Sequence, residues 1–215
     1  MKTGVGKNFS VYSPFKRKWF ELLEDNMLKL YPVPEVRNDL KQNTSDLSDL
    51  LKKYHSSIGD GWEIGENWIQ KKIHEFLDQK GSKYKDERNF PSIDGCSKLS
   101  PYLNAGVISS KWCLNEAAKR NNGELSEGDR GIVHWVSEIL WREFYRHIIY
   151  NFPKVSKNKP FLDYTDKMVW SDNHAFFEAW KKGKTGIPIV DAGIREMIST
   201  GWMHNRCSCL LYTSP

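Results

Sequence analysis

The chain has 215 residues, of which 27% are charged and 39% hydrophobic, the profile of a soluble protein with a sizeable core. Its formal net charge of +5 suits an anionic partner without requiring one. No run approaches the roughly 20 apolar residues of a membrane span, and the first ten residues hold no apolar signal segment. We therefore expect no membrane attachment and no secretory signal.

The four cysteines give no sign of a disulfide framework or a metal site. No C-x-x-C pair occurs, and no histidine lies at zinc-site spacing from a cysteine. The cysteines are Cys96, Cys113, Cys207 and Cys209. We expect a reduced, cytoplasmic protein that binds no metal.

The sequence predicts an all-α fold, because helix signals are frequent and no alternating β-branched run predicts a strand. Ser13-Pro14 predicts a helix start, and Gly81, Pro153, Gly183 and Gly201 predict helix ends. In chain order we expect a helix after Ser13, a long connection over 32–60, helices within 65–81, 109–120, 129–151, 172–183 and 187–201, one short helix within 82–109, and a start near Trp202. We expect no completed helix after Arg206.

The predicted helix 129–151 has two unlike faces. At about 100° per residue, one third of its circumference carries Trp135, Glu138, Trp141, Arg142 and Tyr145. Its other side carries the apolar side chains of Val133, Val136, Ile139, Leu140, Phe144 and Ile148. The apolar side predicts a core contact.

Two interpretations of the aromatic and charged face stay open. The helix could be buried on both sides, with Glu138 and Arg142 as an i,i+4 ion pair of about 0.3–0.5 kcal/mol if exposed. The face could instead line a cavity, where indoles stack on a planar ring and the charged groups bind a polar heterocycle.

A serine-rich turn precedes Pro101. Gly95, Ser97, Lys98 and Ser100 provide backbone N–H groups, hydroxyls and an ammonium group, which suit a phosphate. The turn lacks the GK[ST] of a Walker loop, and serine and glycine turns most often serve only as helix caps.

Six segments together resemble the photolyase/cryptochrome family. They are "VYSPFKRKW", "YKDERNFPSIDGCSKLSPYLNAGVIS", "WVSEILWREFYRHI", "NKPF", "AWKKGKTGIPIVDAGIREM" and "STGWMHNR", in the family's order and spacing. The resemblance runs from about Gly6 to Arg206 and is greatest to class I cyclobutane pyrimidine dimer photolyases. It implies that the chain is the N-terminal, truncated portion of the family's helical FAD-binding domain.

The resemblance implies a set of FAD-binding residues. Tyr84 and the run 96–100 match the family's contacts to the FAD phosphates, and Trp135 and Arg142 match residues near the flavin. The run consists of Cys96, Ser97, Lys98, Leu99 and Ser100. The family usually has threonine where this chain has Cys96, and a thiol donates a weaker hydrogen bond than a hydroxyl.

The resemblance also implies residues for damaged DNA and for electron transfer. Glu138, Trp141 and Asn205 match the catalytic residues that hold the pyrimidine dimer, and Trp170 matches the surface tryptophan of the photoreduction chain. The DNA-binding set adds Arg88, Tyr145 and Arg206.

These matches imply light-driven DNA repair, in which reduced FAD passes an electron to an extruded cyclobutane pyrimidine dimer. The implied partner is dimer-containing DNA, and we expect a monomer. Two alternatives stay open: a cryptochrome-type flavin photosensor without repair activity, and a helical fragment with neither function. Glu138 favours dimer repair, since (6-4) photolyases and animal cryptochromes typically carry glutamine there.

The resemblance predicts that parts of the family's protein lie outside this chain. An N-terminal domain would bind an antenna chromophore, a folate or a deazaflavin, and a C-terminal part would supply further FAD contacts. We therefore divide the chain into a connection with the first helix (1–60) and the first part of the FAD-binding domain (61–207). We expect the chain alone to fold poorly and to bind FAD weakly.

The last eight residues, 208–215, are predicted to be a non-native tail. The family continues after "HNR" with one residue and then Arg-Met-Ile, but this chain has Ser208 and Cys209 in place of the arginine and methionine. "CLLYTSP" is the translation of a transposase end sequence used to prepare sequencing libraries. We hypothesise that 209–215 is translated adapter, with Ser208 at the junction.

Overall fold

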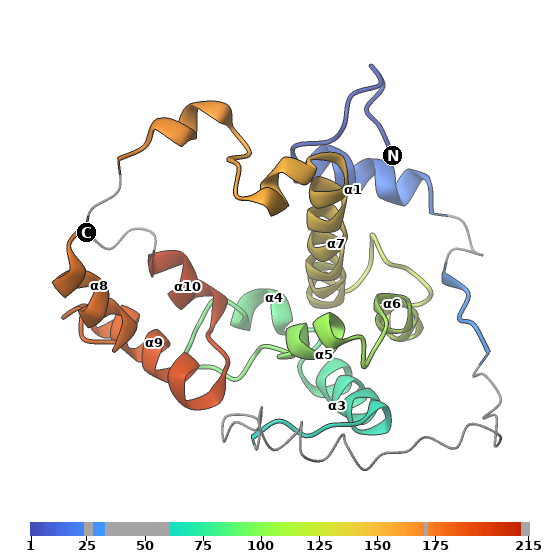
Figure 1. Cartoon of the computed structure of the whole chain (residues 1–215). Helices are drawn as coiled ribbons and strands as arrows, with labels where there is room; N and C mark the ends of the chain where they lie inside the picture. The colour runs from blue at the N-terminus through green and yellow to red at the C-terminus, as the bar shows by residue number, and fades with distance from the viewer. Residues whose placement is uncertain (24–27, 33–60, 170–171, 212–215) are drawn as a thin grey trace, which may run out of the picture. The chain divides into compact units, whose positions relative to one another are not determined.

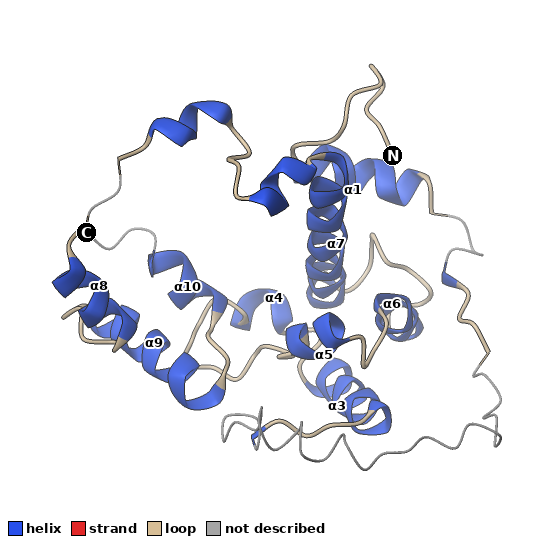
Figure 2. Cartoon of the chain, viewed as in Figure 1, coloured by secondary structure: helices blue, strands red, loops and turns tan. Residues whose placement is uncertain are grey.

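The computed structural model describes residues 1–23, 28–32, 61–169 and 172–211. Within these residues, helices are joined by loops and turns, and no strand occurs (Figure 2). The all-α prediction is therefore confirmed. Apart from residue 32, the predicted connection over 32–60 lies outside the described residues.

The chain divides into two compact units, each with its own contacts. Unit 1 consists of residues 1–29 and 69–172, and unit 2 consists of residues 30–68 and 173–215. The predicted catalytic residues Glu138 and Trp141 belong to unit 1. The predicted catalytic residue Asn205 and its neighbour Arg206 belong to unit 2.

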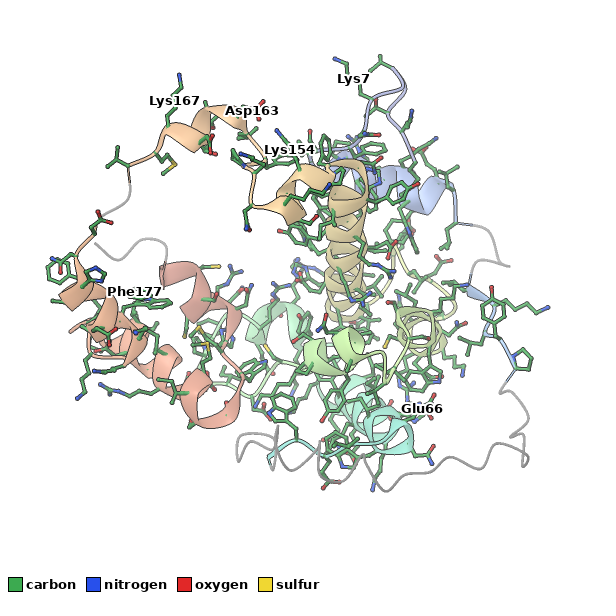
Figure 3. All side chains as sticks on the ribbon, in the orientation of Figure 1. Lys7, Glu66, Lys154, Asp163, Lys167 and Phe177 are labelled. Carbon is green, nitrogen blue, oxygen red and sulfur yellow. The ribbon has the colours of Figure 1, made fainter. Side chains whose placement is uncertain are left out.

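Unit 1 is built around its longest helix, α7. In Figure 1, α1 lies beside the C-terminal end of α7, and α4 and α6 flank its N-terminal half. The elements lying wholly or mainly in unit 1 are α1 (Tyr12–Glu21), α3 (Glu66–Gln79), α4 (Tyr84–Glu87), α5 (Ser100–Ala105), α6 (Ser110–Lys119), α7 (Arg130–Asn151), and the 3₁₀ helices η3 (Pro153–Lys157) and η4 (Asp163–Lys167). Lys154 and Asp163, labelled in Figure 3, form an ion pair of 2.5 Å between the two 3₁₀ helices.

Capping residues begin α6 and α7 where the sequence predicts. The Ser109 hydroxyl accepts the N–H of Trp112, and one oxygen of the Asp129 carboxylate accepts the N–H groups of Gly131 and Ile132. The buried Asn121 amide shapes the loop before α7. Its Nδ2 donates to the carbonyls of residues 124 and 127, and its Oδ1 accepts the N–H of Asp129.

Two predictions in unit 1 are wrong in detail. Helix α1 begins at Tyr12 with Val11 as its N-cap and no side-chain cap bond, so Ser13 and Pro14 lie inside its first turn. Proline is tolerated there because the first N–H groups of a helix have no intrahelical partner. The segment 82–109 contains two short helices, α4 and α5, instead of one. Periodicity cannot reveal α4, a single turn whose Tyr84 is buried edge-on against Phe76.

The core meets α7 on more than one side. Near its C-terminal half, the rings of Phe9, Phe15 and Phe144 form a buried cluster. In its N-terminal half, Trp135 is only 2% exposed and lies 5.9 Å, centroid to centroid, from Phe76 of α3. The helix is therefore buried at Trp135, on the face that the sequence assigned to aromatic and charged residues.

Unit 2 contains α8 (His174–Lys181), α9 (Pro188–Thr200) and α10 (Asn205–Leu211). Asn173 caps α8 by accepting the N–H of Phe176, and Gly201 ends α9 with a left-handed φ of 73°. Helix α8 buries none of its residues, and its Phe177, labelled in Figure 3, is 53% exposed. The helix expected to begin near Trp202 begins three residues later, as α10, and it extends to Leu211.

Candidate functional site

Glu138 lies at the centre of a charged cluster in unit 1. The guanidinium Nη1 of Arg88 donates to Glu138 Oε1, although 50 residues separate the two in the sequence. The Arg88 side chain is only 12% exposed and the Glu138 side chain 33%. The pair is therefore partly shielded from water, and each charge neutralises the other.

The turn of α4 places Arg88 against α7. Arg88 is the C-cap of α4, and its guanidinium lies 5.4 Å from the ring centroid of Tyr84. Burial is the largest single effect on the pKa of Arg88 and lowers it, but the hydrogen bond to Glu138 and the surrounding negative charge together raise the pKa. Burial raises the pKa of the Tyr84 phenol, which therefore keeps its proton at neutral pH. The cluster thus presents a cation, an anion and a neutral hydroxyl.

His134 and Lys16 complete the surroundings of Glu138. His134 Nε2 lies 3.9 Å from Glu138 Oε1, one helical turn earlier on α7. Burial, together with the positive charge of Arg88, lowers the pKa of His134, so its imidazole is mainly neutral at pH 7. Burial also lowers the pKa of Lys16, and the Glu138 charge opposes that shift. The carboxylate thus lies among groups that donate protons or carry positive charge.

The ion pair between Glu138 and Arg142, part of one of the two interpretations of this face, does not form in the described residues. Arg142 is half-buried and donates to the Leu103 carbonyl oxygen at 3.0 Å and to the Ser110 hydroxyl at 3.5 Å. The pair with Arg88 replaces it because α4 brings a second guanidinium to the same carboxylate. In the interpretation of a helix buried on both sides, the Glu138–Arg142 ion pair is therefore wrong, whereas the burial of Trp135 agrees with that interpretation.

Trp141 belongs to an aromatic group that reaches solvent. Its indole stacks on the ring of Tyr12, with 3.7 Å between centroids and 13° between planes. Phe144 meets Trp141 edge-on at 5.7 Å, and Tyr145 lies 5.7 Å away at 28°. Trp141 is half-buried and Tyr145 is 59% exposed, so the group has an accessible flank.

The predicted phosphate turn is held by tertiary contacts at both ends. Gly95 is buried, and a Cβ there would lie 2.8 Å from Glu87 Cβ, so only glycine fits at the start of the turn. Lys98 has a left-handed φ of 50°, and its ammonium lies 3.5 Å from Asp94. Leu99 is buried and precedes Ser100, the first residue of α5.

The side chains of this turn suit an anionic ligand. The Ser97 hydroxyl accepts the indole N–H of Trp135 at 3.2 Å, which leaves its own proton to donate. Burial raises the pKa of the half-buried Cys96 thiol, which therefore adds no negative charge. Lys98 and Ser100 are exposed and add an ammonium and a hydroxyl. Asp94, whose carboxylate lies 3.5 Å from the Lys98 ammonium, is a negative charge beside this turn.

In unit 2, His204 shapes the turn that carries two predicted site residues. Its buried ring accepts the backbone N–H of Arg206 at Nδ1, 3.1 Å away, and the backbone N–H of His204 donates to Glu196 Oε2 at 3.4 Å. Asn205 and Arg206 are both exposed on the first turn of α10. Their grouping with Glu138 and Trp141, which lie in the other unit, stays a prediction.

Trp170, the predicted electron-transfer residue, lies outside the described residues. Among the residues that are described, no group of three or more metal-ligating side chains occurs. Nor does any described helix have the length and apolar character to cross a membrane.

The structure adds residues to the site that the sequence did not single out. They are Tyr12, Lys16, His134 and Ser137. Tyr12 and Ser137 are 125 residues apart, and no local pattern links them. The one available signal for Ser137 is a serine in the middle of a helix, where it has little reason to be unless its hydroxyl is bonded.

Residues 135–212 match the family model described as the FAD binding domain of DNA photolyase. The match starts at Trp135 and so includes Glu138, Trp141, Arg142, Asn205 and Arg206. The solved class III photolyase of Agrobacterium tumefaciens is similar to this chain with a TM-score of 0.74 and 30% identity, over 98% of this chain and 44% of that one. The chain belongs to the photolyase/cryptochrome family.

Other members of the family agree with this assignment. A deoxyribodipyrimidine photo-lyase of Neurospora crassa is 36% identical over 96% of this chain and 36% of its own length. The deoxyribodipyrimidine photo-lyase of Escherichia coli is 36% identical over 95% of this chain and 43% of its own length. A cryptochrome of Synechocystis is similar in structure, with a TM-score of 0.57 and 28% identity over 68% of this chain and 30% of its own. The chain thus spans less than half the length of these photolyase/cryptochrome relatives.

Proposed function

We propose that this chain is part of a light-driven DNA repair enzyme that splits cyclobutane pyrimidine dimers with an electron from reduced FAD. The observation that carries the proposal is the Arg88–Glu138 pair beside Trp141, in a chain whose relatives are named deoxyribodipyrimidine photo-lyases. The Glu138 carboxylate and the Trp141 indole lie within one turn of α7, and α4 brings the Arg88 guanidinium to the carboxylate, so that the three supply hydrogen bonds and a flat apolar surface. A pyrimidine dimer requires both.

The proposed FAD site uses the turn 95–100. Tyr84, Ser97, Lys98 and Ser100 would donate to the diphosphate, and their hydroxyls and ammonium fit such an anion. Trp135 holds Ser97 from behind through its indole N–H. Arg142 would add positive charge near the flavin, and the Leu103 carbonyl holds its guanidinium in place. When bound, reduced FAD supplies the electron after it absorbs blue light.

Arg88 and Glu138 would recognise the edge of a pyrimidine ring. The imide edge of thymine presents an N–H between two carbonyl oxygens. The Glu138 carboxylate would accept the N–H, and a further N–H of Arg88 would donate to a carbonyl oxygen, since a guanidinium has five. The same donor would stabilise the negative charge that the carbonyl gains with the electron, as preorganised donors do.

Trp141 would provide the apolar wall of the dimer site, and Asn205 would hydrogen-bond to the dimer. Arg206 and Tyr145, both exposed, would contact the DNA strand around it. Backbone contacts by basic residues predict binding of undamaged DNA that weakens as salt rises. We further propose that the protein acts as a monomer in the cytoplasm, with an antenna chromophore bound in a separate domain and Trp170 as the surface member of the photoreduction chain.

The chimaera that tests the proposal uses the E. coli relative. Residues 1–207 of this chain would replace the matching segment, which aligns over 204 residues. We expect the chimaera to bind FAD and to split thymine dimers in DNA under blue light but not in the dark. Glu138→Ala should lower the number of dimers split per photon while FAD stays bound. Glu143→Ala, at a half-exposed position on the same helix, is the matched control.

Two results would count against this assignment. Loss of FAD from the Glu138→Ala chimaera would contradict its role at the dimer. A chimaera that binds FAD and responds to light but splits no dimers would favour the cryptochrome-type photosensor, the alternative that the similarity to the Synechocystis cryptochrome supports.

A further inference from the structure

Tyr12, at the start of α1, lies directly behind the proposed dimer-contacting tryptophan. The ring of Tyr12 covers one face of the Trp141 indole at 3.7 Å with nearly parallel planes. Phe144 meets both rings edge-on, at 5.8 Å from Tyr12 and 5.7 Å from Trp141. The indole therefore has little freedom to rotate on that side, because a rotation would separate two large apolar surfaces.

The hydroxyl of Tyr12 is anchored to the helical turn that bears Trp141. It lies 2.8 Å from the Ser137 carbonyl oxygen and 2.7 Å from the Ser137 hydroxyl, while Lys16 Nζ lies 3.3 Å from the same hydroxyl. The hydrogens can satisfy all three contacts at once. Tyr12 donates to the carbonyl, the Ser137 hydroxyl donates to Tyr12, and Lys16 donates to Ser137.

This anchor acts on the backbone of α7 itself. Ser137 lies four residues before Trp141, so its carbonyl is the one that receives the Trp141 N–H in an α-helix. Tyr12 thus holds both the ring of Trp141 and the backbone turn from which that ring projects. Burial raises the pKa of the Tyr12 phenol, so its proton remains in place at neutral pH.

We infer that Tyr12 is a positioning residue for Trp141 and that, through the indole, it sets the preference for dimer-containing over undamaged DNA. The second part of this inference rests on the proposed function; the first does not. Tyr12 touches neither the dimer nor FAD in this assignment. Its effect on DNA binding therefore has to pass through Trp141.

The first experiment tests the positioning itself, without DNA. The chimaera is labelled with fluorotryptophan, and the Trp141 signal in the fluorine NMR spectrum is assigned by its loss in Trp141→Phe. We expect Tyr12→Leu to shift or broaden this signal, and Tyr12→Phe, which keeps the ring, to change it less. Tyr150→Leu is the control, since Tyr150 is 85% exposed on the same helix. An unchanged Trp141 signal in Tyr12→Leu would overturn the inference.

The second experiment measures the affinity of the chimaera for two oligonucleotides of one sequence, one with a thymine dimer and one without. The quantity compared is the affinity for the damaged oligonucleotide divided by that for the undamaged one. We expect Tyr12→Leu to lower this ratio about three- to tenfold, the range for loss of one aromatic pair, with undamaged DNA bound as before. In a Trp141→Ala background the same change should have no further effect. An additive loss in the double variant would overturn the coupling through Trp141.

The two experiments separate failure of this inference from failure of the proposed function. If Trp141→Ala leaves the ratio unchanged, the proposed dimer contact is wrong, and so is the effect of Tyr12 on DNA preference. The fluorine spectrum still decides in that case whether Tyr12 holds the indole. Ser137→Ala gives an independent variant, because it removes one anchor of Tyr12 and leaves both rings. Its ratio should fall by less than that of Tyr12→Leu.

Discussion

The two units of this chain differ in their internal contacts. In unit 1, Arg88 pairs with Glu138 from 50 residues away, and Tyr12 bonds to Ser137 from 125 residues away. In unit 2 most of the bonds that shape α9 and the start of α10 are local, such as the acceptance of the Arg206 N–H by His204 two residues earlier. One exception is the Trp62 indole, which donates to the Thr200 carbonyl at 2.6 Å.

The difference indicates how each unit should respond to mutation. A local bond forms whenever its own segment folds, so its loss should have a limited effect. A long-range bond exists only when the whole unit is assembled, so changes at such contacts should destabilise unit 1 as a whole. The four predictions that follow test this contrast, from the largest expected effect to the smallest.

Gly131→Ala should have the largest effect. A Cβ at this position of α7 would lie 2.2 Å from the Gly81 carbonyl oxygen and 2.3 Å from that of Ser82, and neither backbone segment can move without displacing α7. We expect the free energy of unfolding to fall by about 3 kcal/mol or more. Urea unfolding followed by circular dichroism measures it. Gly4→Ala, with no atom within 4 Å of the new Cβ, is the control. A loss as small as that of the control would contradict the long-range character of unit 1.

Arg88→Met should destabilise unit 1 by about 2 kcal/mol, because the half-buried Glu138 carboxylate loses its partner. Adding Glu138→Gln should restore part of the loss, since the uncompensated charge is then gone. The comparison is Arg146→Met, whose side chain is 65% exposed and pairs with Glu143 on the surface. Equal losses for Arg88→Met and Arg146→Met would place the Arg88–Glu138 pair among ordinary surface pairs.

Gly193→Ala tests the corresponding close approach in unit 2. Its Cβ would lie 2.6 Å from Cys207 Cβ, so the first residues of α10 have to move away from α9. Because α10 is short, we expect a loss of only about 1 kcal/mol in thermal or urea unfolding. The penalty should shrink in a Cys207→Gly background, where the contacting atom is absent. A penalty as large as that of Gly131→Ala would remove the contrast between the units.

Asp191→Asn should have the smallest effect, and one that depends on pH. Hydrogen bonds from the Thr185 side chain and from the N–H groups of Thr185 and Gly186 lower the pKa of Asp191 in the folded state. A lowered pKa stabilises the fold above the unfolded value of about 3.9, and this stabilisation is lost as the pH falls through the folded value. Melting temperatures of wild type and Asp191→Asn should therefore differ at pH 7 and converge in acid. A difference that grows on acidification would refute this sign.

The sequence predicts well what depends on neighbours in the chain. The helices predicted within 109–120, 129–151 and 172–183 begin after side-chain caps at Ser109, Asp129 and Asn173, and the predicted stop at Gly201 has a left-handed φ. The predicted start of α1 is wrong because Ser13-Pro14 is compatible either with the N-cap position or with the first turn of a helix. The turn of α4 was missed because its stability comes from packing against Phe76 and not from its own four residues.

The candidate site also combines features that local spacing predicts with features that only the fold decides. Spacing along one helix is enough to place Glu138, Trp141 and Arg142 close together, since 3.6 residues per turn fixes their directions. The same spacing does not determine which side chain each of these residues contacts. A carboxylate pairs with whichever cation the fold brings nearest, and this proved to be Arg88 instead of Arg142.

By itself, the sequence determined that the protein is helical, where most of its helices begin and end, and which family it resembles. These properties depend on local hydrogen bonds, on periodicity and on the order of short segments. Only the tertiary structure decided that Arg88 neutralises Glu138, that Trp135 is buried, and that Tyr12 lies against Trp141. Such contacts join segments that are far apart in the chain, and their geometry is fixed only when the helices pack.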